Sequence, residues 1–133
     1  MARATLTIVL VLAFGNALAQ GTAVTAEVDT SSAGYVLYRQ QYCGLCHVFA
    51  RAGTAGTFGP THDAMATIAE SRLQDESYNG EASDIASYLR ESIVSPEVYL
   101  VPGYEVSPYK MPAYKQLSAD QVDALVQFLL GDD

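Results

Sequence analysis

The sequence predicts a single all-α domain of about four helices and long loops. Hydrophobic residues recur at helical spacing in four segments, and serines that favour helix N-caps precede the first and the last of them. No stretch alternates hydrophobic and polar residues as a strand does, and no internal repeat occurs. Stretches rich in glycine or proline separate the segments. A chain of 133 residues has room for one domain.

The N-terminal residues predict a secretory signal peptide. Arg3 is followed by an almost wholly apolar run over 6–14 and by small residues near 17–19, the pattern of a cleaved export signal. The run is too short for a transmembrane helix, which needs about 20 apolar residues, and an uncleaved anchor is the alternative. The expected divisions are a signal peptide (1–19), a flexible polar lead-in (20–31) and one domain (32–133). The domain is expected in the periplasm or on the outer face of the cytoplasmic membrane.

Acidic residues dominate the predicted mature chain. Removing residues 1–19 takes away Arg3 and leaves six Lys and Arg residues against 15 Asp and Glu residues. Nucleic acid is therefore not an expected partner, because phosphate binding needs a basic surface. We interpret the acidity as a solvated surface; a field that steers a basic partner is the weaker interpretation.

The first two helical segments lie on either side of a glycine-rich stretch. We expect the first helix to start near Ser32, a good N-cap, and to run toward Tyr42. Residues 53–60 contain three glycines and a proline, so they cannot form a helix interior. The second helix is expected to begin at Asp63. Its apolar face consists of Ala64, Met65, Ile68 and Ala69.

A long loop separates the third and fourth helical segments. The third helix is expected over residues 82–93, because Pro96 prevents its continuation. The following residues, 96–117, contain four prolines and no periodic pattern, and a loop of this length usually has a function. The fourth helix begins after Ser118, which forms a capping box with Gln121. Its apolar stripe consists of Val122, Leu125, Val126 and Leu129.

The segment Cys43-Gly44-Leu45-Cys46-His47 indicates the chemistry of the chain. Its C-x-x-C-H pattern is typical of haem attachment, because two thiols at this spacing on a helix end can each add to one vinyl group of a porphyrin. The adjacent histidine is then placed under the iron. A disulfide is the default for two cysteines in an exported protein. A thioredoxin-like redox pair would expect a βαβ context, and a zinc site would have only His62 as a further ligand.

With this motif in place, the chain resembles the class I cytochromes c. The matching features, in order along residues 32–131, are Gly34, Tyr38, the segment 43–47, Gly59-Pro60, Met111-Pro112, Leu125 and Phe128-Leu129. The resemblance implies a class I cytochrome c fold wrapped around one covalent haem, with the two terminal helices crossing closely at a glycine. Residues 92–112 are also similar to the cytochrome c domains fused to subunit II of some haem-copper oxidases, which indicates a respiratory setting.

The same resemblance implies how the haem is held. One haem c is bound covalently through Cys43 and Cys46, and the iron lies between His47 and Met111. The carbonyl of Pro60 accepts a hydrogen bond from the His47 ring and fixes its orientation. A His/Met pair fills both axial positions, and the thioether favours Fe(II) and raises the reduction potential.

Two further side chains could compete for the iron. Met65 lies on the predicted apolar face of a helix, where a core methionine is the ordinary interpretation. His62 follows Pro60 too closely to reach the opposite haem face, so we interpret it as a histidine on the surface or one layer outside the ligands. The chain has no tryptophan to donate to a haem propionate. The remaining candidates for that contact are Arg72, Tyr88, Tyr99 and Tyr104.

The sequence therefore predicts an electron-transfer protein rather than an enzyme, because no nucleophile, base and orienting group occur together. We expect a mono-haem shuttle that carries single electrons in a respiratory chain. Its expected partners are a quinol-oxidising complex as donor and a terminal oxidase or reductase as acceptor, with membrane contact only peripheral or through an uncleaved signal segment. The alternatives are a cytochrome subunit of a multisubunit oxidase or dehydrogenase and, more weakly, a haem sensor that binds gas after Met111 dissociates.

Overall fold

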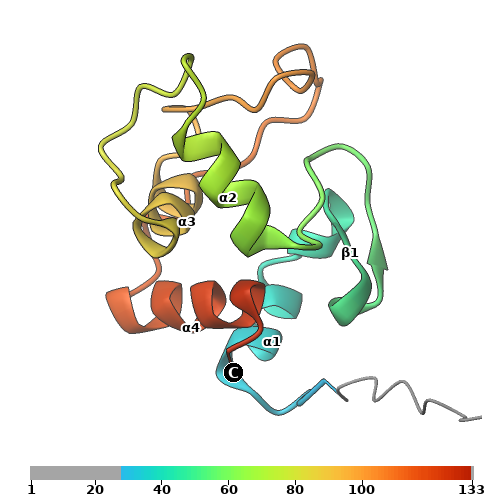
Figure 1. Cartoon of the computed structure of the whole chain (residues 1–133). Helices are drawn as coiled ribbons and strands as arrows, with labels where there is room; N and C mark the ends of the chain where they lie inside the picture. Colours follow the sequence, from blue (N-terminus) through green and yellow to red (C-terminus); the bar gives the residue numbers. More distant parts are fainter. Residues whose placement is uncertain (1–27, 133) are drawn as a thin grey trace, which may run out of the picture.

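Four α-helices make up most of the regular structure in residues 28–132, the part of the chain that the computed structural model describes (Figure 1). They are α1 (Ala33–Gln40), α2 (Met65–Leu73), α3 (Ile85–Val94) and α4 (Ala119–Leu130). The prediction of a small, mostly helical domain with four helices is confirmed. The predicted signal peptide and most of the predicted lead-in lie outside the described residues. None of these helices is long and apolar enough to cross a lipid bilayer.

The helices α1 and α4 pack against each other at one end of the molecule (Figure 1). A Cβ atom on Gly34 would lie 2.3 Å from the carbonyl oxygen of Ala124 and 2.5 Å from Cβ of Phe128, so only glycine allows this approach. The Phe128 ring has no exposed surface, and its centroid lies 5.4 Å from that of Tyr38 and 5.3 Å from that of Phe49. The close crossing of the terminal helices is confirmed.

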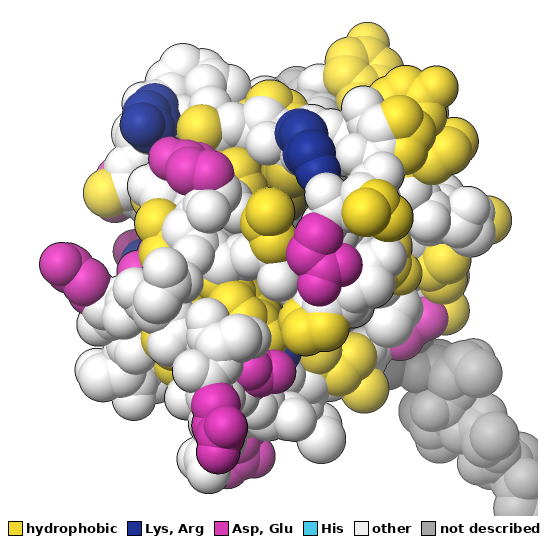
Figure 2. All heavy atoms as spheres, turned by 90° about the horizontal axis from the view of Figure 1, so that it is seen from above, with side chains coloured by type: hydrophobic (Ala, Val, Ile, Leu, Met, Phe, Trp, Pro, Cys, Tyr) yellow, Lys and Arg dark blue, Asp and Glu magenta, His cyan; other side chains and the backbone are white. Residues whose placement is uncertain are grey.

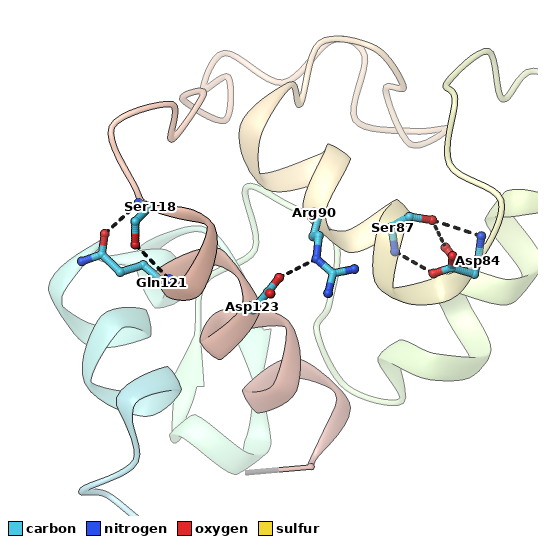
Figure 3. Close-up of polar contacts among 6 residues, drawn as sticks. All are labelled: Asp84, Ser87, Arg90, Ser118, Gln121 and Asp123. Carbon is cyan, nitrogen blue, oxygen red and sulfur yellow. Dashed lines mark hydrogen bonds and ion pairs between the residues drawn. The ribbon is translucent and has the colours of Figure 1, made fainter.

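Side-chain caps begin both α3 and α4 (Figure 3). The Ser118 hydroxyl accepts a hydrogen bond from the Gln121 backbone N–H, and the Gln121 side chain accepts one from the Ser118 backbone, which confirms the predicted capping box. Asp84 and Ser87 form a second, unpredicted capping box. Because Asp84 occupies the N-cap, α3 begins at Ile85, later than the predicted start at residue 82.

Left-handed residues move two further helix ends away from their predicted positions. Tyr42 has φ 57°, a conformation that no α-helix accommodates, and α1 ends at Gln40. Ala64 has φ 54° and occupies the N-cap of α2, so this helix starts at Met65 rather than Asp63. Ala64 is exposed instead of lying on the apolar face.

A small antiparallel sheet follows the C-x-x-C-H motif, so the prediction that the chain contains no strand is wrong. Its strands are β1 (Val48–Phe49) and β2 (Thr54–Ala55), with Val48 opposite Ala55 and Phe49 opposite Thr54. A 3-10 helix, η2 (Ala50–Ala52), connects them, and another, η1 (Cys43–Leu45), contains the first cysteine. Strands of two residues are too short to show an alternating pattern.

The hydrophobic core continues from α4 to α3. Tyr88, Leu89 and Ile93 of α3 are buried in the same cluster as the α1–α4 contact. At the surface, Arg90 pairs with Asp123 of α4 (Figure 3). Because both partners of this pair are exposed, the core contacts rather than the ion pair hold α3 on α4.

Residues 95–118 form a long loop without helix or strand, as predicted. The loop, orange in Figure 1, runs to the end of the molecule opposite α1 and α4 before it returns to α4. Tyr114 fastens its returning part: the backbone N–H donates to the carbonyl of Ile93 and the hydroxyl donates to that of Gln41, at 3.0 and 3.1 Å. The Ser107 hydroxyl donates to the carbonyl of Phe58 at 3.2 Å.

Candidate functional site

A cavity of about 170 Å³ lies between the C-x-x-C-H motif, the helices α2, α3 and α4, and the long loop. This volume is more than ten times what one water molecule needs, which is about 10–15 Å³. The residues singled out from the sequence line it together: Cys43, Cys46, His47, Pro60 and Met111. The fold thus brings side chains from positions 43 to 111 around one space.

The motif itself forms a tight turn that is separate from α1. After left-handed Tyr42, the backbone N–H groups of Cys46 and His47 both donate to the carbonyl of Cys43, at 3.2 and 3.1 Å. The Thr54 hydroxyl donates to the carbonyl of His47 at 2.9 Å and ties the turn to β2. The two thiols are free, and both cysteines line the cavity.

The His47 ring is held at one nitrogen by the backbone. Its Nδ1 lies 2.6 Å from the carbonyl oxygen of Pro60, which is the predicted hydrogen bond. Burial lowers the pKa of His47, although the Pro60 carbonyl opposes this shift. A neutral ring whose Nδ1–H donates to Pro60 keeps its Nε2 lone pair available for a metal. A Cβ atom on Gly59 would lie 2.5 Å from Cε1 of His47, so a glycine is needed beside the ring.

Both candidate thioethers line the cavity, but they are fixed differently. Met65 is 3% exposed and belongs to the hydrophobic core. Met111 is half-buried and lies on the long loop, where Pro112 follows it. Met65 is therefore part of the core packing, whereas Met111 is not.

A polar corner interrupts the mostly apolar lining of the cavity. The Arg72 guanidinium donates to the hydroxyl of Tyr88 at 3.5 Å, and no carboxylate among the described residues pairs with it. The hydroxyl of Tyr99 is buried and lies near the side chains of Asp75 and Ser77, without a hydrogen bond of good geometry to either. Burial and the nearby Asp75 raise the pKa of Tyr99, so this hydroxyl keeps a proton to donate. Such groups are unfavourable in an apolar cavity unless an acceptor joins them. Tyr104 also lines the cavity.

The sequence did not predict the position of His62. Its ring stacks on that of His47, with centroids 3.9 Å apart and an angle of 16° between the planes. Burial, followed by the proximity of His47 and Arg72, lowers the pKa of His62 well below its usual value. A histidine one layer outside the predicted ligand therefore describes His62 better than a surface histidine does. Neither histidine is visible on the face in Figure 2.

The geometry disfavours the competing interpretations of the two cysteines. A redox-active cysteine needs a lowered pKa, whereas burial raises the pKa of Cys43 to about 11. Within residues 28–132, the only strands form a two-stranded antiparallel sheet, and no three His, Cys, Asp or Glu side chains gather as a metal site would require. Comparison with known proteins adds nothing here, because neither a family model nor a curated protein matches the chain.

Proposed function

We propose that the protein is an exported mono-haem c-type cytochrome with the class I fold, which carries single electrons in a respiratory chain. One observation carries this proposal: two free thiols at C-x-x-C spacing, a histidine held by Pro60 with Nε2 available, and the thioether of Met111 all line the same cavity. These are the groups that covalent attachment and six-coordinate ligation of a haem require.

The cavity lining fits a haem on two further counts. Four buried leucine and isoleucine side chains line it and suit the flat, apolar face of a macrocycle. They are Leu89, Ile93, Leu125 and Leu129. The polar corner suits the carboxylates of such a group, since no carboxylate among the described residues pairs with Arg72. Of the four sequence candidates for propionate contacts, Arg72 is therefore the best supported.

A bound haem would supply an iron that cycles between Fe(III) and Fe(II). The residues of the chain would then do three things. Cys43 and Cys46 would fix the macrocycle, His47 and Met111 would occupy both axial positions, and the buried side chains would exclude water. With both axial positions filled and a rigid apolar surround, little rearranges when the charge changes, and no open position binds a substrate.

Electrons would enter and leave at the mouth of the cavity. Tyr42, Phe58, Leu100 and Tyr109 line the cavity and are all exposed. Exposed hydrophobic side chains also appear beside acidic ones on the face seen in Figure 2. A quinol-oxidising complex as donor and a terminal oxidase or reductase as acceptor fit this proposal, in the periplasm or at the outer face of the cytoplasmic membrane.

The decisive experiment tests covalent haem. The chain is produced with a working haem-ligation system, and haem is measured by the pyridine haemochrome spectrum and by haem staining of a denaturing gel. We expect one haem per chain in the native protein and none in the Cys43→Ala/Cys46→Ala double variant. A Thr57→Ala variant, which changes an exposed residue near the motif, is the control and should retain the haem. A colourless native protein would overturn the proposal.

A second function, a cytochrome subunit of a multisubunit oxidase or dehydrogenase, is favoured by the surface of the long loop. Val106 is 89% exposed, and Leu100 and Tyr109 are about half exposed on the same loop. Exposed hydrophobic residues that gather on one segment are typical of a protein interface. Gel filtration of the native protein separates the two functions, because a carrier elutes at its monomer mass and a subunit elutes with its partners.

A further inference from the structure

We propose that His62 is a positioning residue, which fixes the plane of the His47 ring by stacking on it while Tyr38 holds it in place. The proposal rests on the proposed function, in which His47 binds iron. It assigns a role to a side chain that the haem contacts themselves do not use. It also goes beyond the expectation from the sequence, in which His62 had no defined contact.

The contact between the two imidazoles is the closest ring contact among the described residues. Their centroids are 3.9 Å apart and their planes are within 16° of parallel. The further rings around His62 meet it edge-on: Tyr38 at 5.7 Å and 72°, and Phe49 at 6.1 Å and 81°. His62 therefore presents its flat face to His47 and is flanked by aromatic rings elsewhere.

Two polar contacts keep His62 from moving away. The hydroxyl of Tyr38 and Nδ1 of His62 are 3.2 Å apart. The backbone N–H of His62 donates to the carbonyl of Val48 in β1 at 2.8 Å. Burial raises the pKa of Tyr38 to about 12, so this phenol keeps its proton and is a lasting hydrogen-bond partner. The residue is thus fixed both at its backbone and at its ring.

The stack supplies a restraint that the Pro60 hydrogen bond lacks. A hydrogen bond from Nδ1 of His47 to Pro60 holds one atom at the edge of the ring, at 2.6 Å. The ring can still tilt about that atom. A second ring lying flat against it opposes this tilt through close contact over the whole face. The Pro60 hydrogen bond at the edge of the His47 ring and the His62 stack on its face together fix the plane of this ring.

The restraint also connects the site to the helix pair. Tyr38 lies on α1, is 1% exposed and packs against Phe128 of α4. A continuous set of contacts therefore runs from Phe128 through Tyr38 and His62 to His47. Since supporting residues of this kind set how precisely a metal ligand is oriented, the α1–α4 pair contributes to the iron site.

The test uses the intact haem-loaded protein and measures the orientation of the axial imidazole. In a ferric low-spin haem, the spread of the haem-methyl shifts in the proton NMR spectrum depends on the plane of the axial histidine. We expect His62→Leu to change this spread while the pyridine haemochrome still gives one haem per chain. His62→Phe keeps a flat ring and should restore most of the native spread. Tyr38→Phe removes only the hydroxyl and should give a smaller change than His62→Leu.

The control separates orientation from general loosening of the core. Val126→Ala removes buried volume from α4 at a position that does not line the cavity. It should leave the haem-methyl spread at its native value. If His62→Leu leaves the spread unchanged, or if Val126→Ala changes it equally, the positioning role is wrong. A native protein without haem overturns the proposed function instead, so the two failures are distinguishable.

Discussion

The α1–α4 pair and the cavity differ in how completely their side chains find packing and hydrogen-bond partners within the chain. In the helix pair, Phe128 is fully enclosed, and Gly34 brings the two backbones together. In the cavity, Arg72 lies beside a tyrosine rather than a carboxylate, and the buried Tyr99 hydroxyl makes no hydrogen bond of good geometry among the described residues. The packing of the helix pair is completed by the chain's own side chains, whereas the cavity leaves space and a cationic side chain for the proposed haem.

The two regions should therefore respond to different changes. Substitutions in the helix pair should lower the free energy of unfolding, because they remove contacts made within the chain. Substitutions in the cavity should change the spectrum and potential of the proposed haem more than they change the free energy of unfolding. Matched substitutions in the two regions test this difference, from the largest expected effect to the smallest.

The largest effect is expected from Met111→Ala, which removes the proposed second axial ligand. The haem should become partly high-spin, and the reduction potential should fall within the roughly 0.8 V range that axial ligands span. Met65→Leu is the matched control: Met65 lines the same cavity, but this substitution nearly conserves volume in the core and should leave spectrum and potential unchanged. Absorption spectra and a redox titration of both variants measure these effects. Unchanged spectra and potential in Met111→Ala would remove this residue from the iron site.

The second prediction compares two phenylalanines. Phe128→Ala should lower the free energy of unfolding by about 3–5 kcal/mol, since the ring is fully buried among other aromatic rings. Phe58, at the mouth of the cavity, is 47% exposed and contacts Tyr109. Phe58→Ala should cost less than about 1 kcal/mol. Guanidinium unfolding followed by circular dichroism gives both values. Equal losses would contradict the difference between the two regions.

The third prediction compares two glycines that lie similarly close to neighbouring atoms. Gly34→Ala should destabilise the protein by about 1–3 kcal/mol, because its Cβ meets the backbone of α4, which cannot yield. Gly59→Ala brings its Cβ against the His47 ring, which must then leave the orientation that Pro60 and His62 hold. The second variant should change the haem spectrum more than the stability. Guanidinium unfolding and absorption spectra of both variants test this, and a spectral change confined to Gly34→Ala would refute it.

Local chemistry explains which parts of the fold were predictable. The Ser118–Gln121 capping box needs only two side chains three residues apart, and the sequence shows both. The box at Asp84 was missed because Ser87 stands where the pattern expects Glu or Gln. The sheet was missed because its two-residue strands depend on pairing between Phe49 and Thr54. Pairing of this kind leaves no trace in strands so short.

In the candidate site, too, some features can be predicted from the sequence and others depend on the three-dimensional fold. The C-x-x-C-H spacing and the Met111-Pro112 pair identified residues that the structure places around one cavity. The stacking of His62 on His47 depends on how the segment after Pro60 turns back beside β1, which no spacing rule encodes. The surroundings of the Tyr99 hydroxyl likewise become visible only in three dimensions, because Asp75 and Ser77 lie far from it in the sequence.

The smallest predicted effect is a loss of stability at alkaline pH. Burial raises the pKa of Tyr38, in the helix pair, to about 12, from the ordinary value near 10. Below pH 10 the phenol is protonated in the folded and unfolded states, so its contribution to stability is complete. Between pH 10 and 12 the unfolded state loses its proton first, and stability falls as the pH rises. By pH 11 the loss should be on the order of 1 kcal/mol.

Tyr114, in the long loop, tests whether this loss differs between the two regions. Its pKa is also raised to about 12, first by burial and then by the proximity of Cys43 and Cys46. Attachment of haem would turn both thiols into uncharged thioethers. Both thiols raise the pKa of Tyr114 but only Cys43 raises that of Tyr38, so the Tyr114 contribution should shrink more in the haem-loaded protein. Free energies of unfolding at pH 9 and 11 measure this. In the haem-loaded protein, Tyr38→Phe should reduce the loss of unfolding free energy between pH 9 and 11 more than Tyr114→Phe does. A larger reduction from Tyr114→Phe would mean that the loop, not the helix pair, causes the alkaline loss.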